Sequence, residues 1–157
     1  MVRLADLSES ERDYLLARTK ALSGFDGRPW AKCPPLARSR IAIVTTAGLH
    51  RHQDRPFADG AGAAEYRVIP GDVAADDLVI SHLSVNFDRT GFQQDTNVVF
   101  PLDRLRELAN DGVIGAVADY HYSFMGAAPH EQLEPRARQL AGLLKKDRVD
   151  AVVLSPT

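Results

Sequence analysis

An unbroken run of apolar and β-branched residues, Ile41–Thr46 with the sequence IAIVTT, constrains the fold more than any other feature of the chain. A strand covered on one face alternates apolar and polar residues, whereas a strand covered on both faces stays apolar throughout. The run therefore predicts a buried strand of a parallel sheet with helices on both faces. The residues after it, Ala47–His50, predict a turn that leads into a polar loop.

After residue 40, short apolar runs are interspersed with amphipathic segments. Further strands are predicted at Tyr66–Ile69, Leu78–His82, Val113–Val117 and Val149–Leu154. Leucines at helical spacing predict helices over Leu102–Leu108 and Glu131–Lys146, and Pro135 is expected in the first turn of the second helix. This order is typical of the α/β class. Residues 40–157 are therefore predicted to form a parallel or mostly parallel sheet flanked by helices in Rossmann-like layers.

Residues 1–39 are predicted to form a separate N-terminal region. Leu4–Leu22 has the pattern of an amphipathic helix, with Ser8 as a candidate N-cap and Glu11 as its capping-box partner. Arg28–Pro35 contains three prolines and cannot form regular structure. We interpret this proline-rich segment as an arm that lies across the surface of the domain.

The composition excludes several classes of protein. The chain of 157 residues has one cysteine, which excludes a disulfide framework and any zinc or iron–sulfur site made of several cysteines. A formal net charge of −2 without a basic run argues against nucleic-acid binding. The longest apolar stretches are too short to span a bilayer, and early acidic residues argue against a signal peptide. We therefore expect a cytoplasmic protein with no nucleic-acid or membrane partner.

The densest polar segment, Ser81–Asp95, follows a predicted strand. In an α/β sheet, ligands bind at the carboxyl ends of the strands. Arg89 has the planar side chain that can hold a substrate carboxylate through two hydrogen bonds. The alternative is a well-hydrogen-bonded loop with an internal turn at Asp88 and Arg89.

A second candidate cluster contains alternating histidines, His50 and His52. Alternating histidines in a loop can bind a metal ion, with a third ligand from His82 or Asp88. The alternatives are a loop that contacts an anion and a plain solvated loop.

A third candidate segment, Tyr120–Gly126, follows the predicted strand at Val113–Val117. Its polar aromatic residues can line a pocket, with His121 as a general acid or base near neutral pH. The alternative is a histidine whose hydrogen bonds are satisfied among core aromatic residues.

Taken in chain order, several segments match one known family: Trp30–Pro35, Thr45–His50, Tyr66–Asp72, Ile80–His82, Asn86–Leu105 and Tyr120–Gly126. Together they resemble the selenoprotein B family, which is the family of the glycine, sarcosine, betaine and D-proline reductases. The block from Asn86 to Leu105 is the most specific of these segments.

The resemblance implies an oxidoreductase whose working residue is a selenocysteine or a cysteine, with a second cysteine a few residues later. A selenol is more acidic than a thiol, and its anion is the stronger nucleophile. In the family it attacks carbon and displaces an amine from a small amino acid or related substrate. The cysteine then resolves the adduct, and a dithiol such as thioredoxin supplies electrons and becomes a disulfide. The resemblance also implies partner subunits, one with a pyruvoyl group, and no cofactor in this chain.

In the family, the selenocysteine or cysteine follows an apolar strand that is similar to Ala151–Thr157, where this sequence ends. Because UGA encodes selenocysteine and is otherwise read as a stop, we expect a truncated chain. Its sheet would be incomplete at the C-terminus, and the chain alone would be inactive. The alternative is a non-catalytic module of the same family that binds a small molecule or a subunit. A third hypothesis is a metal-dependent hydrolase built on His50, His52, His82 and Asp88.

Under the reductase hypothesis this chain supplies the walls of the site and no metal ligands. The assignments follow from residue type and from position at predicted strand ends. His82 and His121 are the candidates for general acid and base. The candidate substrate-binding residues are His50, Asp88, Arg89 and Tyr122.

Overall fold

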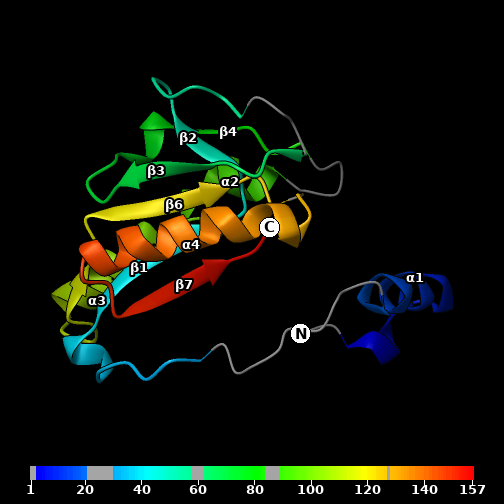
Figure 1. Ribbon diagram of the computed structural model, residues 1–157, viewed down its shortest axis with the longest axis horizontal. Coiled ribbons are helices and arrows are strands. Elements are labelled where there is room, and N and C mark those ends of the chain that lie inside the picture. The colour runs from blue at the N-terminus through cyan, green and yellow to red at the C-terminus, as the bar shows by residue number, and fades with distance from the viewer. Residues whose placement is uncertain (1–2, 21–29, 58–61, 84–88, 127) are drawn as a thin grey trace. The chain divides into compact units, whose positions relative to one another are not determined.

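A computed structural model describes residues 3–20, 30–57, 62–83, 89–126 and 128–157 (Figure 1). The chain divides into two compact units, Met1–Lys32 and Cys33–Thr157, which are described separately.

The first unit contains a short 3-10 helix, η1 (Leu4–Asp6), and the helix α1 (Glu9–Lys20). The predicted capping box is confirmed: the Glu11 N–H donates to Ser8 Oγ at 3.4 Å, and the Ser8 N–H donates to Glu11 Oε2 at 3.2 Å. The helix begins at Glu9 and not at Leu4 as predicted, because Ser8 is its N-cap and the residues before an N-cap lie outside the helix. Residues 30–35 form neither helix nor strand, as their prolines predict.

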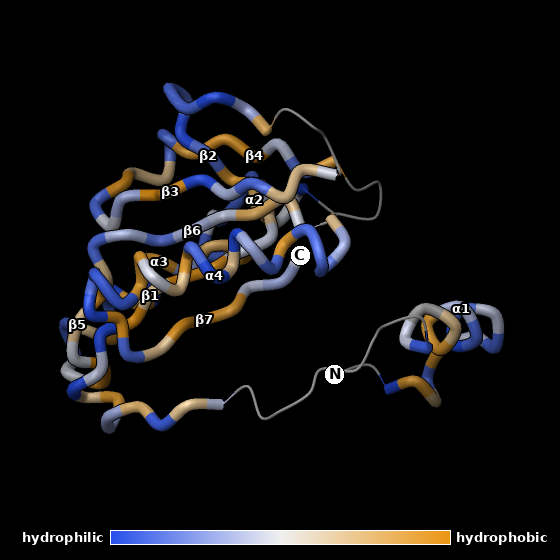
Figure 2. Tube along the Cα trace, in the orientation of Figure 1, coloured by the Kyte–Doolittle hydropathy of each residue, from blue (hydrophilic) through white to orange (hydrophobic). Residues whose placement is uncertain are grey.

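The second unit is built on β1 (Arg40–Thr45), which fits the predicted buried strand. On one side, β1 pairs in parallel with β7 (Ala151–Ser155) along its length. On its other side lie β5 (Ala116–Val117) and then β6 (Tyr120–Phe124), both parallel to β1. Figure 2 shows apolar residues concentrated along β1 and β7.

The main sheet is mostly parallel, as predicted, because β5, β6 and β7 all run parallel to β1, but it is not purely parallel. Strand β3 (Tyr66–Pro70) pairs antiparallel with β6, so the sheet is mixed and a Rossmann-like arrangement is not confirmed. Val68 is half-exposed while Ile69 is fully buried, an alternation that suits an edge strand covered on one face.

A two-stranded antiparallel ribbon lies where the sequence predicted a polar loop and a strand of the main sheet. It pairs β2 (Leu49–Arg51) with β4 (Leu78–Ile80). The expected polar loop at Leu49 and His50 is therefore a strand, and β4 is shorter than predicted and lies outside the main sheet. Gly48 explains the difference, because its φ of +65° turns the chain sharply after β1 and leads it directly into the ribbon.

Two helices cover opposite faces of the sheet (Figure 1). The first, α3 (Leu102–Asn110), buries Leu102 and Leu105 in a cluster with Ile41 and Ile43. The second, α4 (His130–Lys146), packs against the other face of the sheet. Its Leu140 contacts the cluster of Tyr122 and Phe124, with Val44 packed alongside.

Pro135 is not in the first turn of α4, contrary to prediction, because the helix begins five residues earlier at His130. Pro129 directly precedes α4 and has an extended backbone, so Pro129 marks the start of this helix, where Pro135 was expected to do so. The remaining helices are short: η2 (Leu36–Arg38), η4 (Ala75–Asp77), α2 (Thr90–Gln94) and η5 (Thr96–Val98). None of the helices in the described ranges has the length and apolar character needed to cross a membrane.

Candidate functional site

The carboxyl ends of β1, β6 and β7 meet at one closely packed edge of the sheet. The Thr157 N–H donates to Thr46 Oγ1 at 2.8 Å, and the Thr46 N–H donates to the Ser155 carbonyl at 3.1 Å. Gly126 follows β6 with a φ of +83°, and a Cβ there would lie 2.6 Å from the Thr46 Cβ. This is the edge where α/β proteins bind ligands.

The ribbon of β2 and β4 brings His82 to this edge. The Gly48 carbonyl accepts the Ser81 N–H at 2.9 Å, and the Gly48 N–H donates to the Phe124 carbonyl at 2.8 Å. A Cβ at Gly48 would lie 3.1 Å from the His82 backbone nitrogen. The close approach of the two backbones therefore requires glycine at position 48.

His82 and Arg89 lie together. His82 is 5% exposed, and the Arg89 guanidinium donates to the His82 carbonyl oxygen. Burial lowers the pKa of His82, and the positive charge of Arg89 lowers it further. The His82 ring is therefore neutral at pH 7. Arg89 itself is exposed, which places a cation at the surface beside a buried neutral imidazole.

His50 lies in β2 and is 4% exposed, which is close to the exposure of His82. Its Nδ1 lies 2.8 Å from the Arg51 carbonyl oxygen, and its Nε2 lies 2.7 Å from Ser81 Oγ. A carbonyl oxygen can only accept, so Nδ1 carries the proton of the neutral ring and Nε2 accepts the Ser81 hydroxyl. Sequence reasoning gave no role to Ser81. The signal that could have identified it is the period-2 alternation that places residues 79 and 81 on one face of a strand.

His121 is fully buried within β6. Its Nδ1 accepts the Ile43 N–H at 3.0 Å, and its ring is nearly perpendicular to Phe100 at a centroid distance of 5.5 Å. Its Nε2 has no hydrogen-bond partner among the residues that the structure describes. Burial, together with the positive charge of Arg106, lowers the pKa of His121 to about 4. The structure thus places His121 in the core as a neutral ring.

Tyr122, the neighbour of His121 in β6, is 2% exposed. Its ring contacts Tyr66 edge-on at 5.8 Å and belongs to the cluster with Phe124 and Leu140. Burial raises the pKa of Tyr122. Both β6 candidates therefore lie inside the fold, whereas His82 and Arg89 lie at its carboxyl edge. Asp88 falls outside the described residues.

The histidines do not form a metal centre in the described part of the chain. Within the ranges that the structure covers, no three His, Cys, Asp or Glu side chains lie close enough to hold a metal ion. His50 is occupied by Ser81 and the Arg51 carbonyl, and His52 is exposed in the turn that follows β2.

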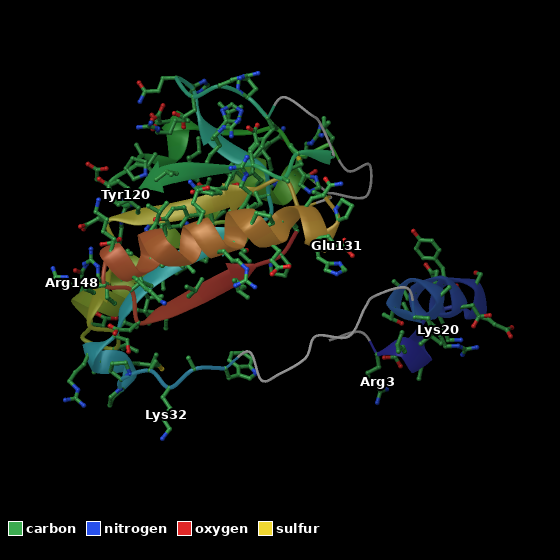
Figure 3. All side chains as sticks on the ribbon, in the orientation of Figure 1. Arg3, Lys20, Lys32, Tyr120, Glu131 and Arg148 are labelled. Carbon is green, nitrogen blue, oxygen red and sulfur yellow. The ribbon has the colours of Figure 1, made fainter. Side chains whose placement is uncertain are left out.

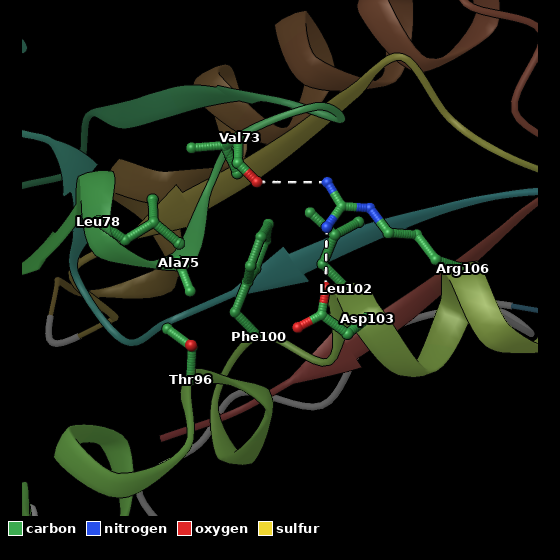
Figure 4. Close-up of a pocket in the computed structure, with 8 residues that line it drawn as sticks. All are labelled: Val73, Ala75, Leu78, Thr96, Phe100, Leu102, Asp103 and Arg106. Atoms are coloured by element: carbon green, nitrogen blue, oxygen red, sulfur yellow. Dashed lines mark hydrogen bonds and ion pairs between the residues drawn. The ribbon is translucent and has the colours of Figure 1, made fainter.

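A small pocket beside α3 contains none of the candidate residues (Figure 4). Its lining residues are Val73, Ala75, Leu78, Thr96, Phe100, Leu102, Asp103 and Arg106. The Arg106 guanidinium donates to Asp103 at 2.8 Å and to the Gly71 and Val73 carbonyls at 2.8 and 3.2 Å. These bonds tie α3 to the turn after β3, so the charged groups of this pocket support the fold.

Figure 3 shows the side chains of the described residues, and the charged residues labelled there, such as Glu131 and Arg148, point outward from their units. An exception is Asp147, whose side chain is 10% exposed and pairs with Arg40 at 2.7 Å. Asp147 Oδ2 also accepts the Asp119 N–H at 3.0 Å. This ion pair lies at the amino end of β1, opposite the carboxyl edge, and joins α4 to the segment between β5 and β6.

Comparison with known proteins identifies the family. Residues 27–157 match a protein family described as "Glycine/sarcosine/betaine reductase selenoprotein B (GRDB)". The chain is 38% identical over 117 residues to D-proline reductase subunit gamma of Acetoanaerobium sticklandii, covering 73% of this chain and 47% of that protein.

Two further relatives are components of reductase complexes. Glycine reductase complex component B subunit gamma of Symbiobacterium thermophilum is 34% identical over 127 residues, covering 78% of this chain and 29% of that protein. Betaine reductase complex component B subunit beta of Peptoclostridium acidaminophilum is 30% identical over 125 residues, again covering 78% and 29%. The chain thus spans less than half the length of these curated relatives. No solved structure matches it. The match over residues 27–157 shows that the chain belongs to the glycine/sarcosine/betaine reductase selenoprotein B family.

Proposed function

We propose that the chain forms part of a reductase that cleaves the C–N bond of a small amino acid or a related substrate. The observation that carries the proposal is the family match over residues 27–157. The relatives named above are components of D-proline, glycine and betaine reductases. In this proposal the nucleophile is a selenol or thiol from outside residues 1–157, because the one cysteine, Cys33, is exposed and precedes the amino end of β1, whereas His82 and Arg89 lie at the carboxyl edge.

In this proposal Arg89 binds the substrate carboxylate. Its guanidinium is planar, permanently charged and exposed beside His82. A carboxylate held there would be oriented by two parallel hydrogen bonds, which fixes the position of the neighbouring C–N bond.

His82 is the group that moves the proton. Its lowered pKa keeps the ring neutral, so it can accept the proton of the attacking selenol or thiol. The resulting imidazolium then protonates the amine that leaves with the electron pair of the C–N bond. A second thiol then bonds to the selenium or sulfur as its bond to carbon breaks and carbon takes a proton, and a dithiol afterwards reduces the new selenium–sulfur or sulfur–sulfur bond. The substrate gains two electrons and two protons, and a dithiol such as thioredoxin becomes a disulfide.

The same proposal gives His121 and Tyr122 a supporting role, since both hold β6 in the core. It also includes other subunits of a reductase complex, and any pyruvoyl group belongs to one of those subunits. Among this chain's residues, Arg89 and His82 are the ones proposed to contact the substrate.

The first test is the nucleotide sequence after codon 157. We expect a selenocysteine or cysteine codon, followed within a few codons by a second cysteine codon. The complete protein, with its partner subunits and a dithiol, should then consume at least one of D-proline, glycine, sarcosine and betaine. If neither codon follows and no substrate is consumed, the reductase proposal fails and a binding module of the same family takes its place.

A variant tests the proposed role of Arg89. Arg89→Ala should raise the KM of the complete enzyme for its substrate at least about 10-fold, since a charge-assisted contact contributes about 1.5–3 kcal/mol. Arg104→Ala is the matched control, because Arg104 is similarly exposed but pairs with Glu107 on α3. An unchanged KM in Arg89→Ala would remove the carboxylate-binding role.

A further inference from the structure

Ser81 and His50 have the geometry of a nucleophile and its base. The Ser81 Oγ lies 2.7 Å from His50 Nε2, within the range of a strong hydrogen bond between a hydroxyl and an imidazole. The opposite ring nitrogen, Nδ1, donates to the Arg51 carbonyl at 2.8 Å. That contact selects the tautomer in which Nε2 has a lone pair directed at the hydroxyl.

The ribbon holds the two side chains on one face. His50 pairs directly with Val79, so Ser81, two residues later, is its diagonal neighbour on the same face. The Ser81 N–H is fixed by its 2.9 Å hydrogen bond to the Gly48 carbonyl. The relative position of Ser81 and His50 is therefore fixed by the backbone register of the ribbon and not by flexible side chains alone.

The group that orients His50 is itself fixed. Arg51 donates its N–H to Asp54 Oδ2 at 3.0 Å, and its guanidinium donates to Asp54 Oδ1 at 2.9 Å. These bonds lower the pKa of Asp54, and the proximity of His50 lowers it further. The Asp54 carboxylate is thus ionised and close enough to His50 to stabilise a positive charge on the ring.

The base is more deeply buried than the serine beside it. His50 is 4% exposed, and its ring lies 6.4 Å from Phe57 in a tilted edge contact. Ser81 is only partly buried, so part of this residue lies at the surface. The Arg89 guanidinium donates to the carbonyl of the next residue, His82, which brings a positive charge to the residue beside Ser81.

From this geometry we propose that Ser81 is a nucleophile activated by His50, and that the pair accepts small activated acyl groups from esters or thioesters. This activity is separate from the proposed reductase chemistry. Ser81 Oγ bonds to the acyl carbon while its proton passes to His50 Nε2. The imidazolium then protonates the leaving alkoxide or thiolate as its bond to the acyl carbon breaks. Water then attacks the acyl carbon while His50 accepts its proton. The bond from the acyl carbon to Ser81 Oγ breaks, the carboxylic acid is released, and the imidazolium returns the proton to Ser81 Oγ.

The test uses the full chain, a fluorophosphonate probe and p-nitrophenyl acetate. We expect one covalent adduct per chain with the fluorophosphonate, mapped by peptide mass spectrometry to Ser81, and release of p-nitrophenol from the ester. His50→Gln keeps a polar group near the position of Nε2 but removes the base, so labelling should slow at least about 100-fold. Ser155→Ala is the matched control, since Ser155 is also a partly buried serine near a strand end, and it should label like the parent chain.

Two results would overturn the proposal. One is labelling of the parent chain that is no faster than labelling of the chain unfolded in urea. That comparison remains valid if His50→Gln fails to fold, which circular dichroism would show. The other is a folded His50→Gln variant that labels at the parent rate. Because neither readout depends on a selenol, a dithiol or another subunit, failure here and failure of the reductase proposal are distinguishable.

Discussion

At the scale of single residues, His121 closes a gap in the sheet. Strand β5 pairs with Arg40 and Ile41, and β6 pairs with Val44 and Thr45, so the strand ladder is interrupted between them. The Ile43 N–H lies in this interruption and donates to His121 Nδ1 at 3.0 Å. A buried N–H without a partner costs about 1–3 kcal/mol, so an imidazole lone pair replaces a missing strand carbonyl here.

This burial makes stability depend on pH. The pKa of His121 is about 4 in the folded chain and 6.5 for an ordinary histidine, so the unfolded chain binds the extra proton between these values. Stability from this group is complete above pH 6.5 and is lost as the pH falls toward 4, by roughly 3 kcal/mol in all. Urea unfolding at pH 7, 5.5 and 4 should show this loss. His121→Asn, whose Oδ1 can still accept the Ile43 N–H, should lose roughly 3 kcal/mol less over the same range; an equal loss would contradict this source of the pH dependence.

Gly126 has a backbone conformation and close neighbours that leave no room for a side chain. Its φ is +83°, and an added Cβ would meet the Thr46 Cβ at 2.6 Å. Gly126→Ala should therefore lower the free energy of unfolding by about 2 kcal/mol or more. Gly142→Ala is the control: Gly142 lies in α4 with nothing within 4 Å of an added Cβ, so this change should raise stability by about 0.5–1 kcal/mol. Chemical denaturation of both variants measures the contrast, and equal effects would contradict it.

At the scale of an element, α3 depends on a cap supplied from outside the helix. The residue at its N-cap position is Pro101, which offers no capping side chain. Asn97 replaces it: its Oδ1 accepts the Asp103 N–H at 3.0 Å, and its Nδ2 donates to Asp95 at 2.8 Å. The polar residues of the segment most specific to the family thus hold α3 in place.

Removal of this cap should destabilise the chain. Asn97→Ala should lower the free energy of unfolding by about 1–2 kcal/mol, because it leaves the Asp103 N–H without its partner. Val98→Ala is the neighbouring control: Val98 is 64% exposed, and its truncation should change stability by less than about 0.5 kcal/mol. Thermal unfolding followed by circular dichroism measures both. If the two variants unfold at the same temperature, Asn97 does not cap α3.

At the scale of the whole molecule, stability resides in the second unit. Every buried cluster draws its members from residues 41–153, on the two faces of the sheet and under the ribbon. The carboxyl edge, with His82 and Arg89, belongs to the same unit. The candidate site is therefore supported by a core to which residues 3–20 and 30–32, the described part of the first unit, contribute no buried cluster member.

Truncation tests this division. A chain that begins at Cys33 should unfold cooperatively, with a free energy within about 1 kcal/mol of the full chain. A chain that ends at Arg148 is the contrasting case, because it lacks β7, which pairs with β1 over five residue pairs. It should lose the cooperative transition in urea. Loss of cooperativity in the first truncation would show that the N-terminal unit is needed for folding.

Local patterns allowed much of the fold to be predicted. The apolar run of β1 and the leucine spacing of α3 and α4 lie within single segments, so hydrophobic periodicity alone identifies them. The capping box at Ser8 and Glu11 is local in the same way. The family resemblance is also a property of the sequence by itself, and the match over residues 27–157 confirms it.

The tertiary structure decided which segments pair and which polar groups meet. The antiparallel edge at β3 and the ribbon of β2 and β4 depend on register between distant residues, which no local pattern encodes. His121 and Tyr122 carry polar groups typical of a site, yet their strand lies in the middle of the sheet, and burial places both in the core. Ser81 and His50 are 31 residues apart in sequence, and they meet because the ribbon's hydrogen bonds place them on one face. Segment identity follows from residues near in sequence, whereas pairing follows from contacts made only when the whole unit has folded.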